Sequence, residues 1–314
     1  MKTLSILGPT ASGKTDLALR LAKTFGAHIL SLDSLAIYRH IDIASAKPTA
    51  EERGRVPHWG IDLLQPDEHF SAAVYIELYH AAKARAEGAG VPLIIVGGTG
   101  FYLKTLMEGI SRFPPVDERV RQKVEKELRN LPGAYETLKH TDPEYAAKIA
   151  PTDRYRIGKG LELLESTGKR PSLYLRRHPP RPILEETALY EIEIDRERLD
   201  ERIRRRTRHM MEAGLVDEVA MLEKRFGREP HPMKAIGIRE VLDYFDAKTS
   251  LEEAEERIAI HTRQLAKRQR TFNATQFPPH TKAGADALYE MIARELTLPD
   301  STPPGRVSAT HPPL

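Results

Sequence analysis

GPTASGKT, formed by Gly8, Pro9, Thr10, Ala11, Ser12, Gly13, Lys14 and Thr15, is the most informative segment of this chain. It matches the P-loop pattern G-x-x-x-x-G-K-[ST] at every fixed position, between a β-prone run and leucines at near-helical spacing. Backbone amides of such a loop form a nest for adjacent phosphates at a helix N-terminus. Lys14 would add a positive charge, and the Thr15 hydroxyl can reach a bound Mg²⁺. The segment therefore predicts a site for a ligand that carries paired phosphates.

Strand-like and helix-like runs alternate through the first hundred residues. Thr3 to Leu7 and Ile29 to Asp33 are strand-like, Ser71 to Glu87 is helix-like with Ser71 as its N-cap, and Leu93 to Val96 is a continuous apolar strand. This alternation favours an α/β fold: a P-loop NTPase-like parallel sheet flanked by helices.

Pro114 and Pro115 mark a change of pattern, after which charged helix-like stretches over 117–129, 143–149 and 153–165 replace the strands. We expect an all-helical insertion domain over 113–187, within a P-loop core formed by 1–112 and 188–298. In the second part of the core, Ala188 to Ile194 is strand-like, and long helices are expected over 198–226 and 250–275. The last segment, 299–314, is rich in Pro, Ser and Thr and is predicted to be a disordered tail.

Composition narrows the class of protein. The 314 residues suggest about two domains, and the net charge of +3 is too small to indicate a partner by itself. The absence of cysteine excludes a disulfide scaffold, thiolate zinc sites, iron–sulfur clusters and cysteine nucleophiles. No apolar run approaches the ~20 residues needed to cross a bilayer, and the N-terminus has no pattern of a signal peptide. We expect a cytoplasmic monomer that does not enter a membrane.

An acidic residue follows the second predicted strand. In an open parallel sheet the carboxyl ends of the strands meet at the ligand crevice, so Asp33 should lie near the P-loop. P-loops are typical of nucleotide-binding and ATP-binding proteins, but phosphoryl-transfer enzymes add an acid after another strand to hold the metal. Here Leu93–Val96 is followed by GGTG, without a carboxylate, which counts against routine nucleotide hydrolysis. Asp33 is a candidate general base; alternatively it caps the next helix or holds the water shell of a metal.

Two predicted helices carry dense positive charge. The first contains Arg196, Arg198, Arg202, Arg204, Arg205, Arg206 and Arg208. The second contains Arg263, Lys267, Arg268 and Arg270. These faces, with Arg176, Arg177 and Arg181, have the pattern of a polyanion-binding surface, although a solvated helix face gives the same pattern. One arginine near the P-loop would suit a diphosphate, because a guanidinium binds phosphate oxygens through two parallel hydrogen bonds.

Taken together, the motifs resemble the tRNA dimethylallyltransferase family, also called tRNA isopentenyltransferases or IPP transferases. In the first half of the chain the resemblance rests on GPTASGKT, Asp33-Ser34 with Tyr38, Ala46-Lys47-Pro48-Thr49, and Gly97-Gly98-Thr99 with Tyr102-Leu103. In the second half it rests on Thr167-Gly168-Lys169, Met210 with Gly214-Leu215, Ala235-Ile236-Gly237, Thr262-Arg263-Gln264 and Ala266-Lys267-Arg268-Gln269. The matches run in order from about residue 3 to 276.

The resemblance implies an enzyme that transfers a dimethylallyl group from dimethylallyl diphosphate to N6 of an adenosine. That adenosine lies immediately 3′ of the anticodon in tRNAs that read codons beginning with U. The implied roles are general base for Asp33, a hydrogen bond near the leaving oxygen for Thr10, and a grip on the diphosphate for Arg206, with Mg²⁺ as cofactor at Thr15. The P-loop, Gly8 to Thr15, would bind the diphosphate. The implied tRNA contacts are Asp33, Ser34, Leu35, Ala36, Thr99, Arg121, Arg156, Ile236, Gly237 and Arg239, with the helical insertion gripping the anticodon stem.

Several residues depart from the family pattern. Ala36 and Tyr155 replace frequent glutamines, and Lys159 replaces a frequent arginine. Trp59 stands where a second histidine is usual, and Phe272-Asn273 stands where Trp-Phe is common. None of these belongs to the implied diphosphate site, so they bear on tRNA recognition only.

Three other functions are compatible with parts of the pattern. A small-molecule kinase would share the P-loop and an acid after a strand. A prenyltransferase of the cytokinin-forming type would use free AMP, ADP or ATP as acceptor, but would need neither the helical insertion nor the basic faces. A noncatalytic RNA-binding module would have no use for Asp33 beside a complete P-loop.

Overall fold

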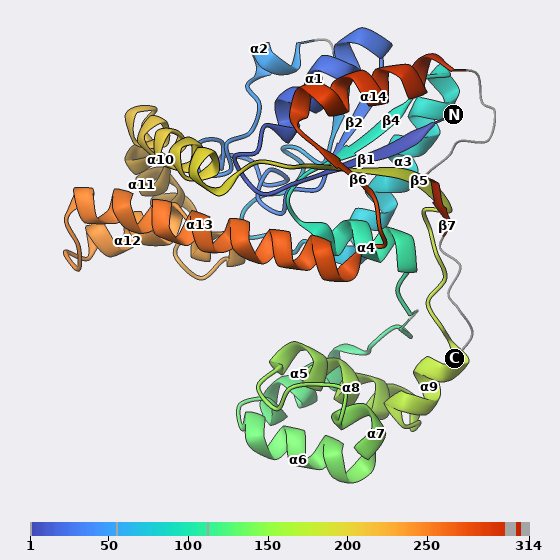
Figure 1. Cartoon of the computed structure of the whole chain (residues 1–314). Coiled ribbons are helices and arrows are strands. Elements are labelled where there is room, and N and C mark those ends of the chain that lie inside the picture. The colour runs from blue at the N-terminus through green and yellow to red at the C-terminus, as the bar shows by residue number, and fades with distance from the viewer. Residues whose placement is uncertain (1, 55, 112, 299–305, 309–314) are drawn as a thin grey trace. The chain divides into compact units, whose positions relative to one another are not determined.

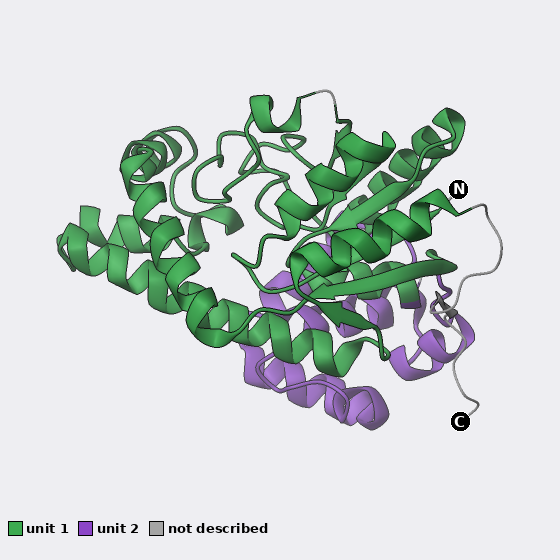
Figure 2. Ribbon diagram, turned by 45° about the horizontal axis from the view of Figure 1, so that its top comes forward, with its two compact units in different colours: residues 1–107, 183–314 green, residues 108–182 purple. Residues whose placement is uncertain are grey.

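The computed structural model describes residues 2–54, 56–111, 113–298 and 306–308. The chain forms two compact units, one of residues 1–107 with 183–314 and the other of residues 108–182 (Figure 2). Both boundaries fall slightly before the predicted ones. Ile183 and Leu184 belong to the first unit because their backbone amides donate to the carbonyl oxygen of Leu106, at 2.9 and 2.8 Å.

A parallel sheet forms the centre of the first unit (Figure 1). Its strands are β1 (Thr3–Leu7), β2 (His28–Ser31), β3 (His58–Trp59), β4 (Leu93–Val96), β5 (Glu186–Ile192) and β6 (Thr281–Ala283). Their spatial order is β3-β2-β4-β1-β5-β6, and every pair along this path is parallel. Parallel neighbours need crossover connections, and helices supply most of them. The predicted α/β fold with a P-loop-type parallel sheet is confirmed.

Helices cover both faces of this sheet, which explains why its central strands are continuous apolar runs. On one face, Leu4 and Ile6 of β1 pack with α1 (Lys14–Phe25) and α14 (Ala285–Thr297). On the other face, Leu7 packs with α3 (Ala72–Ala89) and α4 (Gly100–Glu108). The side chain of Ser71 caps α3 by accepting from the amide of Val74, as its position predicts.

Most of the remaining elements of this unit form a helical layer beside the sheet. They are α10 (Arg196–Glu212), α11 (Leu215–Phe226), the 3-10 helix η1 (His231–Lys234), α12 (Ile238–Phe245) and α13 (Leu251–Gln276). The short helix α2 (Ala50–Arg53) lies apart from them (Figure 1). The expectation of one helix over 198–226 is wrong. Gly214 has φ of 97°, a left-handed conformation that ends one helix and allows α11 to leave in a new direction.

The second unit contains helices joined by loops, and its described residues form no strand. It contains α5 (Glu118–Glu127), α6 (Leu131–Thr141), α7 (Pro143–Ala146), α8 (Arg154–Thr167) and α9 (Pro171–Arg177), around a small core that includes Val124, Leu138 and Ile157. The sequence reasoning missed α6, because Pro132 and Gly133 resemble a turn. The side chain of Asn130 caps this helix, and a proline in the first turn blocks no intrahelical hydrogen bond.

The segment predicted to be a disordered tail falls mainly on residues 299–305 and 309–314, outside the described part of the chain. Within it, Arg306–Ser308 forms β7, which pairs antiparallel with Glu186–Ala188 of β5. Pairing is possible there because β6 contacts only the later residues of β5, Tyr190–Ile192, and leaves the earlier edge open.

Candidate functional site

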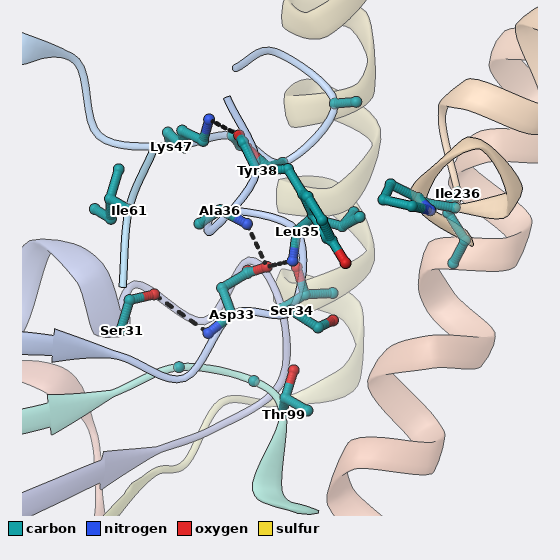
Figure 3. Close-up of a pocket in the computed structure, with 18 of the residues that line it drawn as sticks. Ser31, Asp33, Ser34, Leu35, Ala36, Tyr38, Lys47, Ile61, Thr99 and Ile236 are labelled. Atoms are coloured by element: carbon teal, nitrogen blue, oxygen red, sulfur yellow. Dashed lines mark hydrogen bonds between the residues drawn. The ribbon is translucent and has the colours of Figure 1, made fainter. Parts of the chain in front are cut away.

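A cavity of about 820 Å³ opens at the carboxyl ends of the central strands (Figure 3). A second cavity of about 1390 Å³ adjoins it. Lys14, Thr15, Lys47 and Arg206 line both of them, so the two spaces meet at the P-loop. In an open α/β sheet this end of the strands is the usual ligand site, and the sequence predicted the same place.

The backbone of the P-loop has the curvature of an anion nest. Ala11 and Gly13 have φ of 63° and 96°, so left-handed residues alternate within the loop before α1 begins. Gly8, at φ of 151°, is packed tightly, because an added Cβ would lie 2.8 Å from the hydroxyl of Ser12. Arg202 of α10 holds the loop from outside by donating to the carbonyl oxygen of Ser12 at 2.9 Å. The loop therefore has the alternating backbone conformation of an anion nest.

Two cations lie beside this nest, the buried Lys14 and the half-buried Arg206. Lys14 donates to the carbonyl oxygen of Pro9 at 2.9 Å, and Arg206 donates to the hydroxyl of Thr10 at 3.2 Å. Burial and the neighbouring Arg206 lower the pKa of Lys14 to about 8, while Asp33 acts in the opposite direction. Burial also lowers the pKa of Arg206. Two desolvated positive charges that repel each other favour binding of an anion between them.

Asp33 lies directly beyond β2 and faces the same cavity (Figure 3). Its Oδ1 accepts from the backbone amides of Leu35 and Ala36 at 2.8 and 3.2 Å, and its own amide donates to the hydroxyl of Ser31. The carboxylate therefore does cap the following turn, which was the alternative role. That role uses one oxygen only. Within the described residues, Oδ2 has no hydrogen bond and is available to accept a proton.

Most predicted tRNA contacts in the first unit surround this carboxylate. Ser34, Leu35, Ala36, Thr99 and Ile236 line the cavity (Figure 3). Their elements differ: three follow β2, Thr99 follows β4 and Ile236 precedes α12. Residues from three distant parts of the sequence therefore meet at one site, as predicted.

Glu240 fixes the conformation of the segment that follows Ile236. The buried carboxylate accepts from the amide of Gly237 at 2.7 Å, from Arg239 at 2.5 Å and from the Nδ1 of His261 at 2.6 Å. Gly237 has φ of 97°, so this turn needs both the glycine and the carboxylate. Gly237 and Arg239 are held next to the cavity but do not line it.

Arg121 and Arg156 belong to the helical unit, on α5 and α8. Both are exposed, and each pairs with an acid on its own helix or cap: Arg121 with Glu118 at 3.9 Å and Arg156 with Asp153 at 3.4 Å. Exposed pairs of this kind contribute little to stability, so both guanidinium groups remain accessible to a polyanion. They are not part of the cavity of the first unit.

The sequence reasoning missed the aromatic side of the cavity. The ring of Tyr102 lies 5.1 Å from that of Phe70 and 4.8 Å from that of Tyr75, and both Phe70 and Tyr102 line the cavity. Burial raises the pKa of Tyr102 to about 12, with smaller contributions from Tyr38 and Asp33, so its hydroxyl stays protonated. The three rings come from separate elements, and no local pattern in the sequence joins them.

The residues that depart from the family pattern lie in varied surroundings. Ala36 is buried at the cavity, and Trp59 stacks on His28 with 6.4 Å between ring centroids. Tyr155 on α8 is 71% exposed, with the amine of Lys159 5.9 Å from its ring. Phe272 lies against Gly100 at the start of α4. None of them contacts the P-loop in the hydrogen bonds of the described residues.

Few side chains of the described residues near the P-loop could bind a metal ion. The described residues contain no group of three or more His, Cys, Asp and Glu side chains able to hold an ion. Thr15 lines both cavities beside the nest, and its hydroxyl is a hard oxygen ligand. Mg²⁺ typically binds through few protein ligands, several waters and phosphate oxygens, so this donor set fits a magnesium ion carried by a diphosphate. In the same part of the chain, no helix is long and apolar enough to cross a membrane.

Comparisons with known proteins agree with this geometry. A family model described as IPP transferase matches residues 36–276, and one described as isopentenyl transferase matches residues 1–58. The chain is 46% identical to a tRNA dimethylallyltransferase of Sulfurovum sp. over 93% of this chain and 97% of the relative. It is 41% identical to a tRNA dimethylallyltransferase of Helicobacter pylori over 88% of each.

Solved structures show the same fold. The crystal structure of the full-length tRNA isopentenylpyrophosphate transferase of Bacillus halodurans has a TM-score of 0.67 and 31% identity, over 94% of this chain and 96% of that one. A eukaryotic dimethylallyltransferase, described in crystallographic snapshots as acting on tRNA, has a TM-score of 0.76 and 26% identity. That match covers 87% of this chain and 70% of the eukaryotic one.

Proposed function

Because this chain belongs to the IPP transferase family, we propose that it is a tRNA dimethylallyltransferase that modifies N6 of the adenosine immediately 3′ of the anticodon. The donor would be dimethylallyl diphosphate, and the acceptors would be tRNAs that read codons beginning with U. The observation that carries this proposal is the arrangement of the cavity. A P-loop nest with two cations, and a carboxylate with one unpaired oxygen, line the same space.

The diphosphate is the leaving group in this reaction, and negative charge builds on it as the carbon–oxygen bond breaks. That charge would be stabilised by Lys14, Arg206 and the backbone amides of the loop. Among the described residues, Lys14 and Arg206 donate to a carbonyl and a hydroxyl and form no salt bridge with an acid. Their desolvation makes each interaction stronger than it would be in water. Thr10, which accepts from Arg206, would direct its own hydroxyl proton to the leaving oxygen.

The nucleophile is the exocyclic amine of adenine, which is weak and gains from losing a proton as the new carbon–nitrogen bond forms. The Oδ2 of Asp33 would accept that proton, while Oδ1 keeps the carboxylate in place through Leu35 and Ala36. The aromatic and aliphatic walls, including Phe70, Tyr102 and Met210, would exclude water from the allylic centre. Mg²⁺ bound at Thr15 would supply further charge neutralisation to the diphosphate.

An adenine in a tRNA loop must leave its stack to enter a cavity of this kind. Ser34, Thr99 and Ile236 lie where they would contact the extruded base and its neighbours. The helical unit would bind the anticodon stem by shape and phosphate contacts, with Arg121 and Arg156 as exposed charges.

Mass spectrometry tests the proposal. The full chain is incubated with an unmodified tRNA, dimethylallyl diphosphate and Mg²⁺. The tRNA is then digested, and the masses of its nucleosides are measured. One adenosine per tRNA should gain a C₅H₈ unit, and a tRNA with guanosine at that position should gain none. No gain in any nucleoside contradicts the proposal.

The same assay separates the alternatives. Prenylation of free AMP, ADP or ATP in preference to tRNA would identify the cytokinin-type reaction. Consumption of ATP with phosphorylation of a metabolite would identify a kinase. The proposed reaction consumes no ATP.

A further inference from the structure

One side chain joins the two loops between which the reaction would occur. Gln269 of α13 accepts a hydrogen bond from the amide of Thr10 through Oε1, at 2.7 Å. Its Nε2 donates to the carbonyl oxygen of Gly98, at 2.9 Å. The fit is tight, because a Cβ added to Gly98 would lie 2.3 Å from Nε2. Gln269 therefore contacts the backbone of the P-loop and that of the loop after β4 at the same time.

The chemistry of the partners fixes the orientation of this amide. A backbone N–H only donates, so Oε1 must face Thr10, and a carbonyl only accepts, so Nε2 must face Gly98. A side chain in this position needs one acceptor and one donor at the end of a glutamine-length chain. An ionised glutamate offers two acceptors, and its carboxylate would repel the carbonyl oxygen of Gly98.

Both loops continue directly to groups of the site. On the P-loop side, the hydroxyl of Thr10 accepts a hydrogen bond from the half-buried Arg206. In the loop after β4, the amide of Thr99, next to Gly98, donates to the carbonyl oxygen of Leu32 at 3.2 Å. Leu32 directly precedes Asp33. A short chain of hydrogen bonds thus runs from the phosphate nest, through Gln269, to the backbone that carries the carboxylate.

The helix that carries Gln269 is anchored close by. One turn later, Asn273 donates to the buried carboxylate of Glu191 on β5, at 2.8 Å. Phe272 lies against the first residue of α4, Gly100, where an added Cβ would come within 2.8 Å of its ring. These contacts fix Gln269 relative to the sheet, so its amide is held by a rigid element.

We propose that Gln269 is a positioning residue that sets the separation between the diphosphate nest and Asp33. This inference rests on the proposed function, in which an amine attacks a carbon held between those two groups. Such a transfer needs its reacting atoms in near-attack geometry, and a misplacement of about 1 Å costs about 10²-fold in rate. Both polar atoms of the Gln269 side chain bind backbone groups, so its loss should lower kcat more than it raises the KM for the donor.

The test compares two substitutions in the full chain by steady-state prenylation of tRNA. Gln269→Glu keeps the acceptor for Thr10 but loses the donor to Gly98 while ionised. We expect kcat to fall by about 10²-fold at pH 8. Protonation of the new carboxyl group restores the hydrogen-bond donor to Gly98. The ratio of the kcat of Gln269→Glu to that of the unsubstituted protein should therefore rise as the pH falls. Gln269→Met has similar length and no hydrogen bond, so its kcat should be low with a ratio that does not change with pH.

Gln276→Glu is the matched control on the same helix. Gln276 accepts from the amine of Lys104, which would pair equally well with a carboxylate, so kcat should stay unchanged. Calorimetric titration with inorganic diphosphate should give affinities within a few-fold for all variants, which also reports that they are folded. If Gln269→Glu does not fold, Gln269→Met carries the test.

The outcomes are distinct. A kcat ratio for Gln269→Glu that does not vary with pH, or normal turnover of either variant, overturns the positioning role. A loss confined to the KM of the donor does the same, because it would make Gln269 a binding group only. Absence of prenylation by the unsubstituted protein would instead refute the proposed function, on which the positioning role depends.

Discussion

The P-loop with Lys14 and Arg206, here called the diphosphate cradle, and the helical unit would bind phosphate in two different ways. In the cradle, Lys14 is buried and Arg206 is half-buried, and the backbone amides of the P-loop form a nest beside them. In the helical unit, Arg121 and Arg156 are exposed, and each is paired loosely with an acid on its own helix or cap. The first arrangement suits charge that develops during a reaction, because it is desolvated and preorganised. The second suits a polyanion whose counterions are released on binding.

The largest effect is expected from a change at the base beside the cradle. Asp33→Asn retains an oxygen for the amides of Leu35 and Ala36 but cannot accept a proton from the amine. We expect a loss in kcat of about 10²- to 10⁴-fold with tRNA binding nearly unchanged, because only proton transfer is removed. Single-turnover kinetics and filter binding measure the two quantities. Normal turnover would mean that Asp33 only caps the turn.

The next largest effect is expected at Arg206, the arginine of the cradle. Arg206→Ala removes a desolvated charge and leaves the hydroxyl of Thr10 without its donor, so diphosphate affinity should fall by about 10- to 100-fold. Arg204→Ala, on the same helix, removes an exposed guanidinium that pairs with Asp200 and should leave diphosphate affinity unchanged. Calorimetry with inorganic diphosphate compares them. An equal loss of tRNA and diphosphate affinity in Arg206→Ala would contradict a role confined to the cradle.

A smaller, pH-dependent effect is expected at Lys14. Its pKa of about 8 is lowered in the free protein by burial and by Arg206, and a bound diphosphate should raise it. Diphosphate affinity should therefore be constant below that pH and fall as the pH rises above it, with uptake of a proton on binding. Lys14→Arg should remove this dependence, since arginine stays protonated. Binding without proton uptake at pH 9 would contradict the lowered pKa.

The smallest effect is expected in the helical unit. Arg156→Ala should weaken tRNA binding a few-fold and reduce the slope of log affinity against log salt by about one, because one phosphate contact is lost. Turnover at saturating tRNA should not change. The measurement is a salt titration of tRNA binding for both proteins. An unchanged slope would make Arg156 part of a solvated surface, and a fall in kcat would mean that the two regions do not act separately.

The sequence predicted the cradle better than the rest of the molecule, for a physical reason. The P-loop is a continuous segment whose backbone conformation is determined by its own glycines, and Asp33 follows a strand whose apolar pattern is easily identified. Tyr102 and Gln269 stood in motifs of the family resemblance, but no role followed from those motifs, because both residues, like Phe70, join the site only through tertiary packing. Composition indicated polyanion binding, but Arg121 and Arg156 gave no signal of their own beyond the family resemblance.

The fold was predicted to a similar degree. Each central strand was found because a strand buried on both faces needs an apolar run. The break at Gly214 was missed because a charged helix-like pattern continues on both sides of it, and only the left-handed backbone of this glycine separates α10 from α11. The helix α6 was missed because its first turn contains Pro132 and Gly133.

A crystal structure with a slowly reacting analogue of dimethylallyl diphosphate, such as the thiodiphosphate, tests whether donor and base share one cavity. We expect both phosphates in the nest between Lys14 and Arg206, with the first carbon of the prenyl group facing the Oδ2 of Asp33. A prenyl tail that points away from Asp33, or a nest that remains empty at saturating analogue, would contradict the account.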